Sequence, residues 1–204
     1  MTQTIHVLAV IISFVAFAQT SAISLSAGIG QCLSDLATEE LTVSYNYLQL
    51  SSKFGTTNAY PGFSSLFTKL SDDDSSKAHD LVKFLALRKA PIVRLIKKDG
   101  IEIHRELAGV LDIYQGLTEA RRQNKAVWDE VVRCHGEADN AKDANVQDYL
   151  ESHLLDHHIE IDKLLADLEH RVNSVQASEK KLTTFMVDEE LLETYGDRRK
   201  DIFS

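Results

Sequence analysis

The sequence has little proline, glycine and cysteine, and it has no second long apolar stretch after its N-terminal segment. It contains two prolines and nine glycines in 204 residues. Proline breaks helices and glycine weakens them, so their scarcity in the apolar-periodic segments argues against a loop-rich or β-rich domain and favours an all-α class. Without a further run of spanning length, a polytopic membrane protein is excluded, and we expect no membrane partner.

Positive charge is also scarce. Lysine and arginine total 22 against 31 aspartates and glutamates, which gives a formal net charge of −9. Binding nucleic acid requires a basic face, and the basic groups Arg121-Arg122 and Arg198-Arg199-Lys200 are short, so we expect no nucleic-acid partner. The acidic balance is compatible with cation binding, but it is also common in ordinary soluble proteins.

The one long apolar run lies at the N-terminus. Residues 7–18 carry no charge and contain a single serine. The run is too short for a comfortable membrane span, and small residues, Thr20 and Ala22, stand at the usual positions before a cleavage point. We therefore predict a signal peptide over 1–22, one mature domain over 23–204, and a location in the secretory lumen and outside the cell. A retained anchoring helix is the structural alternative.

Only two cysteines are present, Cys32 and Cys134. The predicted secretory route favours their oxidation. A bond between them would close a loop of about a hundred residues and contribute roughly 4 to 5 kcal/mol in the chain-entropy model. A bond between two protomers is the alternative, whereas a zinc site would need further thiols or well-spaced histidines.

Apolar residues recur every three or four positions in four long segments and one shorter one, which predicts helices. The predicted helices cover about 27–53, 63–90, 105–138, 145–175 and 180–195. An extended connection over about 91–103 is long enough to cross a whole bundle, whereas neighbouring antiparallel helices need only about two to eight residues. We therefore predict a four-helix bundle with one long crossover and a short fifth helix.

Glu40 is an acid inside an apolar stripe. It shares the helical spacing of Leu33, Leu36, Ala37, Leu41, Ser44 and Leu48. An unpaired carboxylate removed from water costs several kcal/mol, so Glu40 needs a metal, a cation, a hydrogen-bonding partner or a proton. His79 on the second predicted helix and the acids and histidines of residues 151–158 on the fourth supply such partners, in a pattern typical of metal-binding bundles.

Two segments carry a resemblance to a known family. The first helix reads Glu40-Leu41-Thr42-Val43-Ser44-Tyr45-Asn46-Tyr47-Leu48, and the fourth reads Asp148-Tyr149-Leu150-Glu151-Ser152-His153-Leu154-Leu155. Both closely resemble ferritin. The resemblance covers most of the mature chain, follows the same order of helices and crossover, and includes His79. With its signal peptide and cysteine pair, the chain is similar to secreted ferritins of the insect type. This implies a ferritin-like four-helix bundle in an iron-storing shell of twenty-four subunits.

Ferritin chains that oxidise Fe²⁺ use a di-iron site of carboxylates and one histidine on the first three helices, with a polar residue on the fourth. The resemblance places Glu40 and His79 at two of these positions. It places Ser76 and Asn124 where glutamates are expected, and His158 where glutamine is usual. Two iron ions repel each other and need several carboxylates, so we expect no ferroxidase. Glu40, His79 and His158 would form a vestigial site that holds one divalent ion loosely, or a polar cluster without metal.

The resemblance implies two further iron sites. Family shells admit iron through acidic pores on the threefold axes, and the matching residues are Asp148 and Glu151, with His135 alongside. A solvated surface is the alternative for this Asp-x-x-Glu pair. Asp74 ends an acidic run, Asp72-Asp73-Asp74, near positions that face the cavity in this family. It is a candidate for mineral nucleation, with plain solvation as the alternative.

Our leading hypothesis is a non-catalytic light-type subunit of a secreted ferritin shell, which stores and transports iron beside heavy-type subunits that oxidise it. Leu182, Phe185, Met186 and Leu192 of the last helix are expected at a fourfold interface. The first alternative is an altered ferroxidase that uses Glu40, His79 and His158. The second is a secreted helical carrier or signalling protein that forms no cage.

Overall fold

The chain is helical wherever the structure describes it. The computed structural model describes residues 24–56, 58–90, 107, 109–110 and 112–196, and these ranges contain helices and no strand. The elements are α2 (Ala27–Thr56), α3 (Pro61–Leu87), α4 (Ile113–Asn140), α5 (Ala144–Leu150), the π-helical turn η2 (Glu151–Leu155), α6 (Asp156–Asn173) and α7 (Lys180–Tyr195). The all-α class is confirmed. Across these ranges, no helix has both the length and the apolar character that crossing a bilayer requires.

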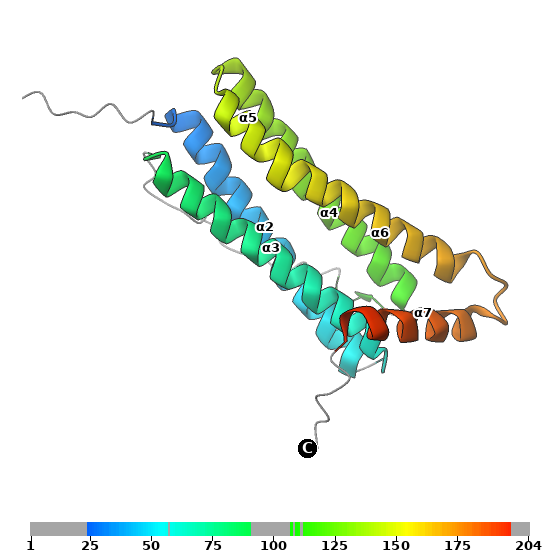
Figure 1. Ribbon diagram of the computed structural model, residues 1–204. Helices are drawn as coiled ribbons and strands as arrows, with labels where there is room; N and C mark the ends of the chain where they lie inside the picture. Colours follow the sequence, from blue (N-terminus) through cyan, green and yellow to red (C-terminus); the bar gives the residue numbers. More distant parts are fainter. Residues whose placement is uncertain (1–23, 57, 91–106, 108, 111, 197–204) are drawn as a thin grey trace, which may run out of the picture.

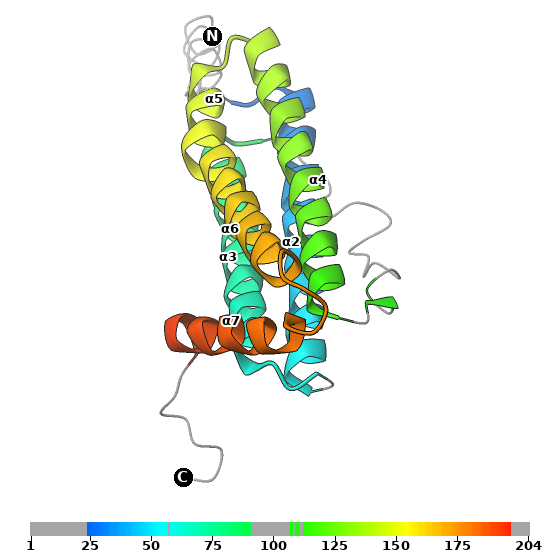
Figure 2. The same ribbon diagram turned by 90° about the vertical axis from the view of Figure 1, so that its right-hand side faces the viewer.

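The long helices form a bundle of two antiparallel pairs (Figures 1 and 2). α2 packs along α3, and α4 packs along the rod formed by α5, η2 and α6. α3 and α4 run in the same direction, as a long crossover requires. The predicted crossover at 91–103 and the predicted signal peptide at 1–22 themselves lie outside the described residues. The fifth helix, α7, lies across one end of the bundle.

One predicted helix boundary is wrong. The third helix was expected from about residue 105, but α4 begins at Ile113. The cause is the cap residue Asp112, whose side chain accepts a hydrogen bond from the backbone N–H of Gln115 at 2.9 Å and so fixes the first turn. Leu107 is buried ahead of this cap, outside the helix, so its apolar character reflects packing rather than helical phase.

A disulfide joins the two helix pairs. Cys32 on α2 and Cys134 on α4 are bonded within the chain, with their Cα atoms 5.6 Å apart. This confirms the intrachain pairing over the interchain alternative. α2 and α4 also approach each other closely near the start of α4. Gly116 on α4 leaves room there for the ring of Phe54 on α2, because a Cβ at Gly116 would lie 2.3 Å from the Phe54 Cζ atom.

α7 is held against the start of α3 by a buried acid. The Oδ1 atom of Asp188 accepts a hydrogen bond of 2.8 Å from the backbone N–H of Phe63, in a first turn that has no side-chain cap of its own. Gly62 makes this approach possible, since a Cβ at that position would lie 1.8 Å from the Asp188 carbonyl oxygen. The short fifth helix is therefore confirmed, and its place is fixed by contact with α3.

Candidate functional site

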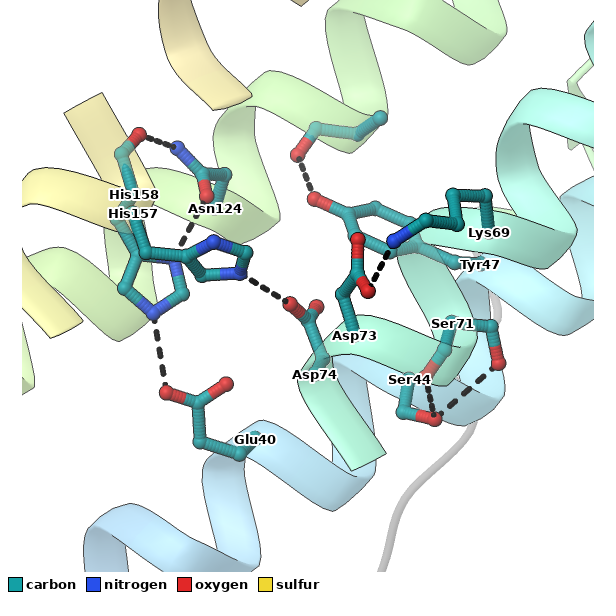
Figure 3. A network of polar contacts seen from close by, with 11 residues as sticks. Glu40, Ser44, Tyr47, Lys69, Ser71, Asp73, Asp74, Asn124, His157 and His158 are labelled. Carbon is teal, nitrogen blue, oxygen red and sulfur yellow. Dashed lines mark hydrogen bonds and ion pairs between the residues drawn. The ribbon is translucent and has the colours of Figure 1, made fainter. Parts of the chain in front are cut away.

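Polar side chains from α2, α3, α4 and α6 meet in the middle of the bundle (Figure 3). They are Glu40 from α2, Asp74 from α3, Asn124 from α4, and His157 and His158 from α6. All except His157 are at most 2% exposed. We call these five residues the buried cluster.

Helical spacing places both acids of the cluster in the core. Glu40 lies four residues after Leu36, and Asp74 lies four residues after Leu70 and four before Ala78. All of these residues are buried. Residues four apart share one face of an α-helix, so each carboxylate follows the apolar stripe that packs its helix against the others.

A chain of hydrogen bonds runs from Asn124 through His158 to Glu40. The Nδ2 atom of Asn124 donates to the backbone carbonyl of His158 at 2.8 Å, and its Oδ1 atom lies 2.8 Å from the ring Nδ1 atom. The amide oxygen can only accept, so Nδ1 carries the ring proton. The Nε2 atom of His158 lies 3.0 Å from the Oε1 atom of Glu40. One proton shared between these two atoms completes the chain.

Burial places that shared proton on Glu40. Loss of hydration raises the pKa of Glu40 to about 8, against smaller opposing effects of His157 and Lys77. Burial also lowers the pKa of the His158 imidazole. Both shifts favour a neutral carboxylic acid that donates to a neutral imidazole over a buried ion pair. Among the described residues, the other carboxyl oxygen of Glu40, Oε2, has no hydrogen-bond partner.

Asp74 and His157 form a second, looser acid–imidazole pair. The Nε2 atom of His157 lies 3.5 Å from the Oδ1 atom of Asp74, which is too long for a strong hydrogen bond. Burial raises the pKa of Asp74 to about 6, while the neighbouring His157 opposes this rise. The rings of His157 and His158 meet edge to face with centroids 5.3 Å apart, so the two pairs are adjacent.

The buried cluster contains metal-binding groups, but it is not arranged as a pre-formed metal site. Among the described residues, no three carboxylate or imidazole ligand atoms of the cluster lie within 4.8 Å of one another. Lys77 adds a positive charge that lowers the pKa of both Glu40 and His158. An incoming cation would have to break the Glu40–His158 hydrogen bond and would be repelled by this ammonium group.

The second helix, α3, contributes a different residue to the buried cluster from the one predicted. His79 and Ser76 lie on the exposed side of α3, so His79 is not brought together with Glu40 and His158. Asp74, expected at the cavity surface, lies in the buried cluster instead. The reason is helical phase, because His79 follows Asp74 by five residues and so points about 140° away around the helix.

Asp74 and His157 are the cluster residues that sequence reasoning did not assign to the site. For Asp74 a signal existed, since it lies in phase with Leu70 and Leu81 on the buried face of α3. His157 is one of the histidines of residues 151–158 that the sequence offers as partners for Glu40, but helical spacing did not single it out. Adjacent helical residues point about 100° apart, so the period that places His158 in the core gives no reason to include its neighbour.

The residues expected at an iron-admitting pore lie at the end of α4 and at the start of the rod formed by α5, η2 and α6. The Nε2 atom of His135 on α4 lies 2.7 Å from the Oε1 atom of Glu151, the first residue of η2. Glu151 and Asp148 are both exposed. The structure therefore brings His135 and Glu151 together and leaves two carboxylates facing outwards on one stretch of the rod.

Sequence comparison with known proteins agrees with this helical arrangement. Residues 31–173 match the family model of the ferritin-like domain. One relative, the ferritin light chain, oocyte isoform, of Xenopus laevis, is 26% identical over 155 residues, which cover 75% of this chain and 84% of the relative. The family match extends from α2 through α6 and contains every residue of the buried cluster. The chain therefore belongs to the family of ferritin-like domains.

Proposed function

We propose that this chain is a light-type subunit of an iron-storing ferritin shell and that it does not itself oxidise Fe²⁺. Membership of the ferritin-like family and the similarity to a protein named as a ferritin light chain support this proposal. The observation that carries it is the composition of the buried cluster. Its two carboxylates each face an imidazole, and the amide of Asn124 bonds to one of these imidazoles. The positive charge of Lys77 acts on the same group by lowering the pKa of Glu40 and of His158.

This composition is unsuited to a pair of iron ions. Two metal ions about 4 Å apart repel strongly in a low-dielectric interior and need bridging carboxylates between them. Glu40 is protonated at neutral pH because its pKa is raised to about 8, so it offers little negative charge. The amide of Asn124 is occupied by two hydrogen bonds to His158. The remaining ionised acid is Asp74, which is too little to offset two cations.

The surface acids fit a role in admitting iron. Asp148 and Glu151 are exposed within one turn, and His135 contacts Glu151. Repeated around a threefold axis of a shell, these carboxylates would create a negative potential that attracts Fe²⁺. We propose that iron enters there and is oxidised by heavy-type partner subunits, while this chain forms part of the wall and supports the stored mineral.

Secretion belongs to the same proposal. Residues 1–22 have the composition of a signal peptide, and a disulfide such as Cys32–Cys134 persists in oxidising compartments. We propose that the shell is assembled in the secretory lumen and released from the cell.

Iron oxidation by the pure recombinant chain tests the proposal. We expect oxidation no faster than in buffer, and restoration of oxidation when heavy-type subunits are mixed in. A gain-of-function variant, Lys77→Glu with Asn124→Glu, adds two carboxylates to the buried cluster and should increase metal binding there. Ser76→Glu adds one carboxylate on the exposed side of α3 and is the control for negative charge placed away from the buried cluster. Rapid stoichiometric oxidation by the unmodified chain, lost in Glu40→Ala, would contradict the proposal.

The position of Asp74 favours a second candidate function, an altered ferroxidase. Asp74 gives the interior a second carboxylate, so Glu40, Asp74, His157 and His158 together offer four ligands if Glu40 releases its proton. In that case oxidation by the pure chain should fall strongly in Asp74→Asn. It should be unchanged in His79→Ala, because His79 is exposed on the other side of the same helix.

A further inference from the structure

A second group of potential metal ligands joins α2 to α4, outside the buried cluster. The Sγ atoms of Cys32 and Cys134 and a carboxylate oxygen of Glu130 all lie within 4.8 Å of one another. Elsewhere in the described ranges, no three His, Cys, Asp or Glu side chains meet this limit. In the oxidised chain the two sulfurs are bonded to each other and cannot act as thiolate ligands. Reduction would leave two thiols beside a carboxylate.

The backbone geometry suits a tetrahedral ion. Glu130 precedes Cys134 by four residues, so both side chains lie on one face of α4, opposite Cys32 on α2. The Cα atoms of the two cysteines are 5.6 Å apart. A tetrahedral ion with metal–sulfur bonds of about 2.3 Å requires sulfur atoms about 3.8 Å apart. Rotation of the two short side chains can open that separation while the helices stay packed.

Arg133 holds the carboxylate of Glu130 in place. Its Nη2 atom donates a hydrogen bond to the Oε1 atom of Glu130, and its Nε atom donates one of 2.9 Å to the Oε2 atom. A carboxylate oxygen has two lone pairs, so it can keep its bond to Arg133 and still ligate a metal, and such outer partners orient ligands in metal sites. Both cysteines are buried, whereas the Glu130 side chain is 20% exposed. The solvent-accessible side of the group is therefore the side of the carboxylate.

We propose that Cys32, Cys134 and Glu130 form a redox-gated binding site for one thiophilic divalent cation of the Zn²⁺ class. Two equivalents of a small thiol reduce the protein disulfide, which yields two protein thiols and one small-molecule disulfide. The cation then displaces one proton from each thiol and binds two thiolates and the carboxylate, with water as the fourth ligand. Thiolates favour such ions over hard cations such as Mg²⁺ and Ca²⁺. The site goes beyond the proposed iron storage and does not depend on it.

Cd²⁺ binding to the full-length mature chain tests the proposal. Chain produced under reducing conditions is titrated with Cd²⁺, and the cadmium–thiolate charge-transfer band is followed in the ultraviolet. We expect one Cd²⁺ per subunit with this band in the reduced chain and no band in the disulfide form. The band distinguishes the site from Cd²⁺ held by surface carboxylates, and circular dichroism monitors the helices throughout.

Variants of the chain test whether Glu130 is a ligand or whether the two thiols bind the cation without it. Glu130→Gln should weaken Cd²⁺ binding by at least about tenfold. Glu137→Gln removes an exposed acid of the same helix outside the group and should leave binding unchanged. Cys32→Ser with Cys134→Ser should abolish the band. Absence of the band in the reduced chain, loss of its helices on reduction, or equal binding by the two glutamine variants would each overturn the proposal.

Discussion

At the scale of single residues, the interior tolerates an acid because the acid keeps its proton. Glu40 is fully buried, and its partner His158 is held by Asn124 in the orientation that presents an unprotonated nitrogen. A neutral acid and a neutral imidazole complete a hydrogen bond without placing net charge in the core, which avoids the large cost of a buried ion pair. The cluster therefore stabilises the bundle as a polar contact between α2, α4 and α6.

The protonation of Glu40 predicts that the fold loses stability as pH rises from 6.5 to 8.5. Glu40 ionises near pH 4.5 in the unfolded chain but only near pH 8 in the folded one, so between these values the folded state binds the extra proton. Below pH 6.5 the lowered pKa of His158 has the opposite effect, because there the unfolded imidazole binds the extra proton. Above pH 6.5 the Glu40 effect is the largest and amounts to about 2 kcal/mol, with a small contribution of the same sign from Asp74, whose pKa is raised to about 6, and a small opposing one from His158.

Thermal unfolding at pH 6.5 and 8.5 measures this effect, with Glu40→Gln as the comparison. Glutamine cannot ionise but can still donate a hydrogen bond to His158, so the variant should lose much less stability over the same interval. An equal decline in both proteins would show that other groups cause it.

At the scale of helices, apolar spacing predicted the elements well, whereas the family resemblance selected the wrong face of α3. The periods of Leu33, Leu36 and Phe63, Leu66 placed α2 and α3, and the length of the connection predicted the parallel order of α3 and α4. The start of α4 was missed because apolar residues continue ahead of the cap at Asp112. On α3, the resemblance pointed to His79, whereas the buried stripe passes through Asp74. Contacts between helices, such as Asn124 to His158, leave no periodic signal in the sequence.

The docking of α7 predicts a large effect for one buried acid. Asp188→Ala removes the acceptor for the Phe63 N–H and leaves that donor buried, so we expect a loss of about 1 to 2 kcal/mol in the free energy of unfolding. The neighbouring Glu189 is exposed, and Glu189→Ala is the matched control. Denaturant titration measures the loss, and proteolysis should cut α7 faster in the Asp188 variant alone. Equal behaviour of the two variants would mean that Asp188 does not anchor the helix.

At the scale of the whole molecule, α7 presents three large apolar side chains to solvent. Leu182, Phe185 and Met186 of α7 are 64%, 55% and 56% exposed, and their spacing of three and four places them on one face. Exposed apolar side chains on one helical face are a candidate contact surface for another chain, which fits the proposed shell. Size-exclusion chromatography and negative-stain imaging of the purified protein would separate a shell from a free carrier without a cage.

The disulfide predicts a dependence of subunit stability on redox conditions. Cys32 and Cys134 lie 102 residues apart in the sequence, and a loop of that size is worth about 4.7 kcal/mol in the chain-entropy model. Cys32→Ser with Cys134→Ser should therefore lower the thermal midpoint and remove its sensitivity to reductant. An unchanged midpoint would indicate that contacts along the bundle, rather than the crosslink, hold α2 to α4.

Iron uptake by the assembled protein depends, on this proposal, on the exposed acids near η2. In shells mixed with heavy-type subunits, Asp148→Asn with Glu151→Gln in this chain should slow uptake severalfold at low ionic strength, because steering of a cation by surface charge is a rate effect. The same change should reduce the sensitivity of uptake to salt, since screening acts on the charges that have been removed. Glu160→Gln removes an exposed acid of α6 away from this site and should leave the rate unaltered. If both variants take up iron at the rate of the unmodified shell, then these carboxylates form a solvated surface and iron reaches the interior elsewhere.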